Sequence, residues 1–170
     1  MAYISHQALA ERPGARELAQ VATAAHLAMV DPVLMELTLL GASRTGWGVD
    51  QIAAADDALA RIDDTVTAAD GVINGFLVRR GYTVPITPVP ALVSTWSRDI
   101  TRYLLHKDRL SSEGTDPIVR AYKDALALLQ QLAAGKFSLG AGDPIVGVAA
   151  SVQFESTPPV FGRAELDHFR

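Results

Sequence analysis

Hydrophobic residues recur at steps of three and four over the centre of the chain, and this spacing predicts one long helix. The buried stripe of that helix is Leu59, Ile62, Val66, Ala69, Ile73 and Phe76. Gly81 follows, at a position where a left-handed glycine often ends a helix. Pro85, Pro88 and Pro90 then exclude helix and favour extended backbone. We therefore expect a long helix that ends in a rigid, proline-rich corner.

Two further helices are predicted after the corner. The apolar stripe of the first is Val93, Trp96, Ile100 and Tyr103. The second begins at Asp116-Pro117, because an aspartate N-cap followed by proline at the first helical position is a typical helix start. Its stripe is Val119, Tyr122, Leu126, Leu129 and Ala133, and Gly135 ends it. Each apolar stripe indicates a helix that packs on one side.

Shorter helices are predicted in the amino-terminal part of the chain. Residues 5–11 form a first short helix, which Pro13-Gly14 stops. Residues 15–27 form a second, alanine-rich helix with a weak apolar face. Asp31-Pro32 repeats the combination of N-cap and proline and predicts a third helix over residues 33–40.

The sequence changes character after Gly140. Residues 143–154 are rich in valine and glycine, which favours a strand or a hairpin arm. Residues 155–159 form a stiff, proline-containing linker. The terminal segment over residues 160–170 carries three large apolar residues, namely Phe161, Leu166 and Phe169. A disordered tail would explain this segment, but aromatic residues beyond a finished core also suit a docking anchor.

The complete pattern predicts an all-α fold, a bundle of about four main helices with a small β arm and an extended carboxy-terminal tail. At 170 residues the chain is long enough to bury a core as one domain. We divide it into a helical domain over residues 1–140 and a β arm with an extended docking tail over residues 141–170.

Composition and charge narrow the possible functions. The chain has no cysteine, which excludes disulfides and thiolate metal sites. Its net charge of −4 argues against a protein that holds nucleic acid by its phosphates. No apolar run approaches the ~18 residues of a transmembrane helix, and residues 1–6 lack the layout of a secretion signal.

The sequence contains no recognisable catalytic grouping. His6, His26, His106 and His168 have no metal-ligand spacing and are interpreted as four unrelated histidines. No glycine-rich phosphate loop follows a predicted strand, and no Gly-x-Ser-x-Gly motif occurs. We therefore expect neither an enzyme nor a cofactor.

Aspartates lie at seven-residue intervals on the long helix. Asp57 and Asp64 are placed opposite the apolar stripe, whereas Asp63 and Asp70 lie at its edge. Such residues form a solvated face in most helices. Alternatively, some of these carboxylates face arginines of a neighbouring subunit or line a channel.

The residues around the corner match a longer pattern in order and spacing. The matching positions are Ile73, Phe76, Leu77, Arg80, Tyr82, Pro85, Val89, Pro90, Asp99, Ile100, Tyr103 and Leu105, followed by residues 122–125, 132–136 and 139–140. In these positions the chain resembles the small head–tail connector proteins, also called adaptor or head-completion proteins, of Mu-like tailed phages and prophages. The resemblance covers residues 55–140 well and residues 3–20 loosely, and it leaves residues 23–48 as an insertion.

The resemblance implies a structural virion protein. Such a protein forms a homo-oligomeric ring, of twelve copies to match a portal, beneath the capsid vertex. It joins the portal protein to the downstream stopper or tail-terminator protein and continues a channel through which DNA passes without specific binding. It would act in the virion neck, after assembly in the host cytoplasm and without a membrane. The alternative is a cytoplasmic helical binding or regulatory module.

Three groups of residues are candidates for this role. Those placed between subunits are Arg79, Arg80, Tyr82, Arg98, Asp99 and Arg102, although a surface patch with a local Asp99–Arg102 pair would also explain them. Those placed in the portal-docking tail are Phe154, Val160, Phe161, Arg163, Leu166 and Phe169. Asp57 and Asp64 are the candidates for lining the channel.

Overall fold

The computed structural model describes residues 2–109 and 116–140, and this part of the chain contains helices and loops but no strand. The all-α prediction is therefore confirmed. The β arm expected over residues 143–154 and the docking tail lie outside the described residues. The elements are α1 (His6–Leu9), η1 (Ala10–Gly14), α2 (Ala15–Ala22), α3 (Pro32–Leu39), α4 (Val49–Arg80), α5 (Ala91–His106), η2 (Lys107–Arg109) and α6 (Pro117–Ala133).

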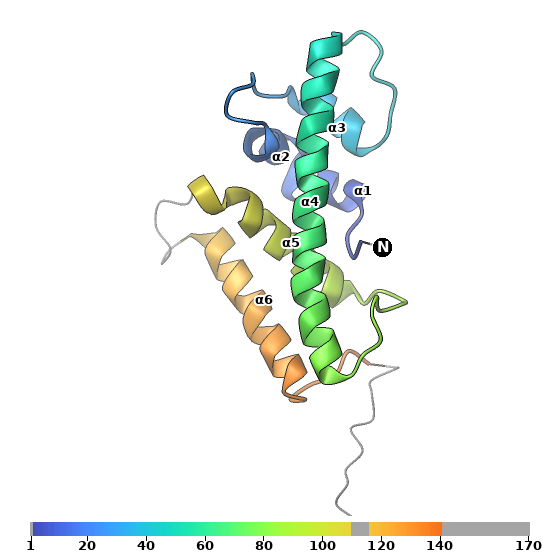
Figure 1. Ribbon diagram of the computed structural model, residues 1–170, viewed down its shortest axis with the longest axis vertical. Helices are drawn as coiled ribbons and strands as arrows, with labels where there is room; N and C mark the ends of the chain where they lie inside the picture. Colours follow the sequence, from blue (N-terminus) through green and yellow to red (C-terminus); the bar gives the residue numbers. More distant parts are fainter. Residues whose placement is uncertain (1, 110–115, 141–170) are drawn as a thin grey trace, which may run out of the picture.

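The long helix α4 is the axis of the molecule (Figure 1). Its start is capped by Gln51, whose side-chain oxygen accepts a hydrogen bond from the Gly48 N–H at 3.0 Å. Its end is Gly81, which has a φ of 99° and is the left-handed residue that the sequence predicts. Helices α1, α2 and α3 lie beside the amino-terminal half of α4, whereas α5 and α6 pack along the remainder (Figure 1).

Two apolar clusters line α4, one on each half. The first joins α1, α2 and α3 to α4 and includes Leu9, Leu18, Leu34, Met35 and Ile62. The second joins α5 and α6 to α4 and includes Ile73, Leu77, Trp96, Ile100 and Leu129. Because both clusters share one continuous helix, the two halves form a single rod-like unit.

The buried face of α4 differs from the predicted stripe at two positions. Leu59 and Phe76 are half-buried, whereas Leu77 is completely buried where α4 packs against α5 and α6. Ile73 and Leu77 are four residues apart, which is slightly more than one helical turn. The buried face of α4 therefore rotates slightly toward the side that α5 and α6 cover. The other predicted stripe residues of α4 are buried as expected.

Helix starts follow the prediction closely, but one helix end does not. Asp31 and Asp116 cap α3 and α6, since their carboxylates accept hydrogen bonds from the backbone two residues later at 2.8 and 2.7 Å. The helix expected over residues 15–27 instead stops at Ala22. There Thr23 adopts extended backbone, and its hydroxyl donates to the Ala19 carbonyl and accepts from the Val30 N–H.

Part of the segment that the family pattern treats as an insertion belongs to the core. Val30, Leu34, Met35 and Leu39 are buried in the first apolar cluster. Helix α3 thereby covers α2 and the amino-terminal half of α4. This packing makes the segment over residues 30–39 a structural element of the amino-terminal half.

Candidate functional site

Asp70 is the centre of a buried polar network rather than an edge residue of the stripe. Only 7% of it is exposed. One carboxylate oxygen accepts a hydrogen bond from the Tyr3 N–H at 2.9 Å, and the other accepts one from the Ser97 hydroxyl at 2.7 Å. A buried carboxylate is tolerated where such donors replace water. Asp70 therefore fastens the amino-terminal segment and α5 to α4.

Tyr3 extends this network to the proline corner. Its hydroxyl donates to the side-chain oxygen of Asn74 and accepts from the Ile86 N–H at 3.3 Å. Its carbonyl accepts from the Ser94 hydroxyl at 2.9 Å. Burial, with a further contribution from the nearby Asp70 carboxylate, raises the pKa of Tyr3 above its usual value despite the Ile86 hydrogen bond. The residues of this network are too far apart in the sequence for periodicity to predict their contacts, although Asp70 and Ser97 each interrupt an apolar face.

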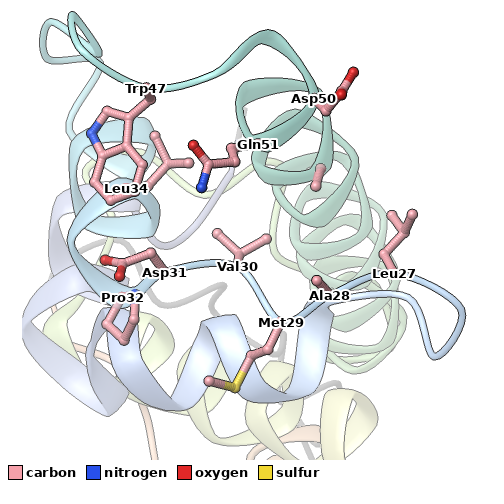
Figure 2. Close-up of a pocket in the computed structure, with 11 residues that line it drawn as sticks. Leu27, Ala28, Met29, Val30, Asp31, Pro32, Leu34, Trp47, Asp50 and Gln51 are labelled. Atoms are coloured by element: carbon pink, nitrogen blue, oxygen red, sulfur yellow. The ribbon is translucent and has the colours of Figure 1, made fainter.

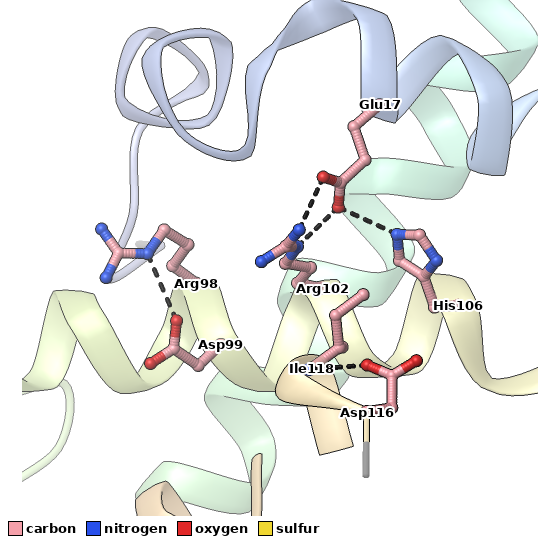
Figure 3. Close-up of polar contacts among 7 residues, drawn as sticks. All are labelled: Glu17, Arg98, Asp99, Arg102, His106, Asp116 and Ile118. Atoms are coloured by element: carbon pink, nitrogen blue, oxygen red, sulfur yellow. Dashed lines mark hydrogen bonds and ion pairs between the residues drawn. The ribbon is translucent and has the colours of Figure 1, made fainter. Parts of the chain in front are cut away.

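A second cluster of charged residues joins α2 to α5 (Figure 3). Arg102 donates two hydrogen bonds to the two carboxylate oxygens of Glu17, at 2.5 and 2.7 Å. His106 Nε2 lies 2.9 Å from the same Glu17 carboxylate. Burial alone would raise the pKa of Glu17, but the hydrogen bonds from Arg102 and His106 outweigh it and hold this pKa below its usual value.

The local Asp99–Arg102 pair, one of the two alternatives for these arginines, is not the main contact of Arg102, although the Asp99 carboxylate is close enough to contribute to its electrostatic environment. Arg102 pairs with Glu17 of another helix, and Asp99 instead lies 3.3 Å from Nε of its neighbour Arg98 (Figure 3). The spacing of Asp99 and Arg102 permits a pair within α5, but the bidentate geometry with Glu17 is stronger. The sequence contains no signal that places α2 against α5, so it does not predict Glu17 as the partner of Arg102.

The other candidates for subunit contacts differ in their exposure. Tyr82 is buried, and its hydroxyl accepts a hydrogen bond from the Leu139 N–H at 3.2 Å. Arg79 is exposed and Arg80 is half-buried at the end of α4. Arg98 and Asp99 are half-buried on α5. Surface for a neighbouring subunit therefore remains at Arg79 and, in part, at Arg98, Asp99 and Arg102, whose side chains are 28%, 23% and 37% exposed.

The channel candidates Asp57 and Asp64 are both exposed on α4. Asp57 lies 3.5 Å from the Arg61 guanidinium, one turn along the helix. Asp64 has no ion pair within the described part of the chain. Asp56 and Asp63, in contrast, pair with Arg44 and His6. The acidic face is thus partly neutralised within the molecule.

An apolar pocket of about 430 Å³ lies between the 27–34 segment and the start of α4 (Figure 2). Its walls include Leu27, Val30, Leu34, Trp47 and Ala54, with two aspartates at its edge, Asp31 and Asp50. The Asp31 carboxylate is already used as a helix cap. The pocket holds no pair of nucleophile and base, so its lining suits apolar contact rather than catalysis.

The histidines do not form a metal centre among the residues that the structure describes. His6 and His106 each contact one carboxylate, and no group of three or more possible ligands occurs in residues 2–109 and 116–140. His168 lies outside the described residues. Within the same ranges, no helix is both long and apolar enough to cross a membrane.

The sequence of the chain is similar to those of known phage proteins. A sequence model of the family described as "Bacteriophage Mu, Gp36" matches residues 3–154. The chain is 31% identical over 106 residues to "Mu-like prophage FluMu protein gp36" of Haemophilus influenzae, an alignment that covers 61% of this chain and 72% of that relative. No solved structure gives a significant match.

Proposed function

The chain belongs to the bacteriophage Mu gp36 family, and from this membership we propose that it is an adaptor ring of the virion neck. The ring joins the portal to the downstream stopper or tail-terminator protein and continues the DNA channel. The observation that carries this proposal is the match over residues 3–154, because it spans the whole helical domain rather than one motif.

The shape of the domain supports a place in a ring wall. Helix α4 has 32 residues, which corresponds to roughly 48 Å at 1.5 Å per residue. Apolar clusters fasten the other helices to both of its halves. A stiff unit of this length can transmit a fixed geometry from one neck component to the next. Copies placed side by side around an axis would form a wall.

The surface charges support contacts between copies and passage of DNA. Arg79, Arg98 and Asp99 lie at or near the surface beside the proline corner, where arginine can pair with carboxylates of a neighbour. The exposed Asp57 and Asp64 face is the proposed channel lining, since negative charge there keeps the DNA backbone from sticking. The tail residues Phe161, Leu166 and Phe169 are proposed to dock on the portal.

A binding or regulatory module is the second candidate function, and the apolar pocket near Trp47 favours it. A pocket of about 430 Å³ has the size of a site for a small apolar group or one large side chain. Yet a module that docks DNA needs a basic helix face, whereas the exposed face of α4 is acidic. The adaptor role accounts for this charge without a further assumption.

Imaging the protein together with the portal protein of the same phage tests the adaptor role. The purified proteins are mixed, separated by size and examined by electron microscopy. We expect rings of the chain seated on one end of the portal, with a copy number that matches it. A chain that stays separate from the portal over a wide concentration range would contradict the proposal. A matched control uses a portal from an unrelated phage.

A further inference from the structure

Three arginines meet at a polar pocket between η1 and α5. The pocket has a volume of about 280 Å³ and is lined by Arg12, Pro13, Arg98, Asp99 and Arg102. Arg98 and Arg102 extend from the same side of α5 toward the amino-terminal helices (Figure 3). Arg12 and Pro13 complete the pocket from a segment almost ninety positions earlier in the chain. The fold, and not the sequence spacing, creates this concentration of positive charge.

The backbone of Arg12 departs from the helices around it. Arg12 has φ −150° and ψ 119°, so it is the residue at which the chain kinks between α1 and α2. Gly14 follows with a φ of 104°, a conformation that favours glycine. This kink sets Arg12 beside α5 instead of within a regular helix. The side chain is exposed and free to contact a partner.

The charges of the pocket do not cancel among the residues that the structure describes. Asp99 compensates Arg98, and Glu17, which is outside the lining, compensates Arg102. Arg12 has no ion pair in the residues that the structure describes. Asp116 also acts on Arg102, but it does not line the pocket, and its carboxylate caps α6 by accepting a hydrogen bond from the Ile118 N–H. The three arginines, Asp99 and Glu17 together leave a charge of about +1, the amount that one carboxylate neutralises.

We propose that this pocket binds a single carboxylate, supplied by an aspartate or glutamate side chain of an adjacent copy of the chain. The proposal rests on the proposed ring. The planar guanidinium of Arg12 suits bidentate pairing with a carboxylate. Asp99 lines the same pocket and repels a doubly charged phosphate more than a singly charged group. With 19 acidic against 15 basic residues, each copy has carboxylates left over for its neighbour.

Charge reversal at Arg12 tests the contact between copies. Sedimentation of the free chain, and of its complex with the portal, is compared for the wild type, Arg12→Glu and the control Arg16→Glu. Arg16 is exposed on α2 and undergoes the same charge change outside the pocket. We expect Arg12→Glu to raise the dissociation constant between copies at least tenfold, roughly the loss of one good ion pair. Rings that form equally well with Arg12→Glu would overturn the carboxylate contact but not the adaptor role.

Titration of the free chain with acetate tests the pocket even if the wild type forms no ring. The arginine Nε–H signals are followed by NMR, with sodium chloride at equal ionic strength as the reference. We expect acetate to shift the signals of the pocket arginines in the wild type and to leave them unchanged in Arg12→Gln. No shift beyond that of chloride would overturn the proposal. So would tighter binding of phosphate or duplex DNA, which would identify a nucleic-acid contact.

Discussion

At the scale of single residues, buried polar groups decide how the helices are joined. Asp70 interrupts the apolar face of α4, yet hydrogen bonds from Tyr3 and Ser97 replace the water that it loses. Glu17 likewise exchanges water for two partners on α5, Arg102 and His106. Such groups stabilise one arrangement of the helices, because any other arrangement leaves a buried charge without partners.

Trp96 is the largest side chain of the core. It is 1% exposed and packs in the second apolar cluster, with the ring of Phe137 edge-on at 6.4 Å. Trp96→Ala should lower the free energy of unfolding by about 3–5 kcal/mol, as large aromatic truncations do. Denaturant unfolding measures this loss. A loss below about 1 kcal/mol, typical of surface positions, would contradict the core assignment.

Trp96→Phe is the matched control for this substitution. The indole nitrogen of Trp96 is buried without a hydrogen-bond partner in the described part of the chain. Replacing the indole by a phenyl ring removes this unpaired donor and keeps most of the apolar volume. Trp96→Phe should therefore lower the free energy of unfolding by less than about 1.5 kcal/mol.

Glu17 should make stability depend on pH in the acid range. Its pKa in the folded state lies below the usual value of 4.5, so its contribution to stability is present above pH 4.5 and is lost as the pH falls through the folded-state pKa. Glu17→Gln should cost about 1–2 kcal/mol at neutral pH. This cost lies between those typical of exposed and of buried ion pairs, because the Arg102 side chain that pairs with Glu17 is 37% exposed. The difference from wild type should shrink toward pH 3, as measured by denaturant unfolding. Glu36→Gln, at an exposed position of α3, should show no such pH dependence.

At the scale of elements, α4 organises the fold because every other long helix packs against it. Its amino-terminal half meets α2 and α3, and its remainder meets α5 and α6 (Figure 1). The helix also carries the exposed acidic face. One element therefore provides both the framework and the proposed channel surface.

Two glycines in the carboxy-terminal third of α4 weaken the helix without a packing reason. A Cβ added at Gly71 or Gly75 would meet no atom within 4 Å. Gly71→Ala and Gly75→Ala should each stabilise the fold by about 0.5–1 kcal/mol, because alanine loses less backbone freedom in a helix. Thermal melting measures the gain. Gly81→Ala should instead destabilise, since Gly81 has a φ of 99°. Destabilisation by the first two changes would indicate a role for local flexibility of α4.

The carboxy-terminal tail is the element expected to bind the portal. Deletion of residues 157–170 should leave helicity and the melting temperature nearly unchanged, because the two apolar clusters that the structure describes are formed by residues before position 140. The same deletion should abolish portal binding through the loss of Phe161, Leu166 and Phe169. Circular dichroism and co-sedimentation with the portal measure the two effects. Normal portal binding by the truncated chain would contradict the docking role.

At the scale of the whole molecule, the two apolar clusters and the shared helix make one elongated unit, and the complete chain has a net charge of −4. A ring of such units would be strongly acidic overall. Its negative surface would repel the DNA backbone, so DNA could pass along the ring without being held by it. The arginines around the proline corner and the η1–α5 pocket are local exceptions to this charge.

The free protein should not bind duplex DNA measurably at physiological salt, where non-specific binders typically reach about 10⁻⁴–10⁻⁶ M. Replacing Asp57 and Asp64 by lysine should preserve the fold, because both side chains are exposed. The double variant should slow DNA packaging or ejection if this face lines the channel. Phage assembly assays and circular dichroism measure these effects. Salt-sensitive micromolar binding of duplex DNA by the wild type would favour a nucleic-acid-binding module instead.

The sequence alone determined the helices and most of their ends, because the interactions that set them are local. The carboxylates of Asp31 and Asp116 cap helices only two residues away, and Gly81 ends α4 by its own backbone conformation. The apolar periodicity also predicted most of the buried face of α4, and the corner pattern led to the correct phage family.

Only the tertiary structure decided which residues meet across those faces. Glu17 and Arg102 are 85 residues apart, and Tyr3 and Asp70 are 67 apart. Periodicity reports which side of a helix is buried, but it does not report which helix covers that side. The ion pairs of Arg102 and the pocket at Arg12 depend on how α2 and η1 dock against α5. Their geometry therefore follows from packing of the whole domain rather than from any local segment.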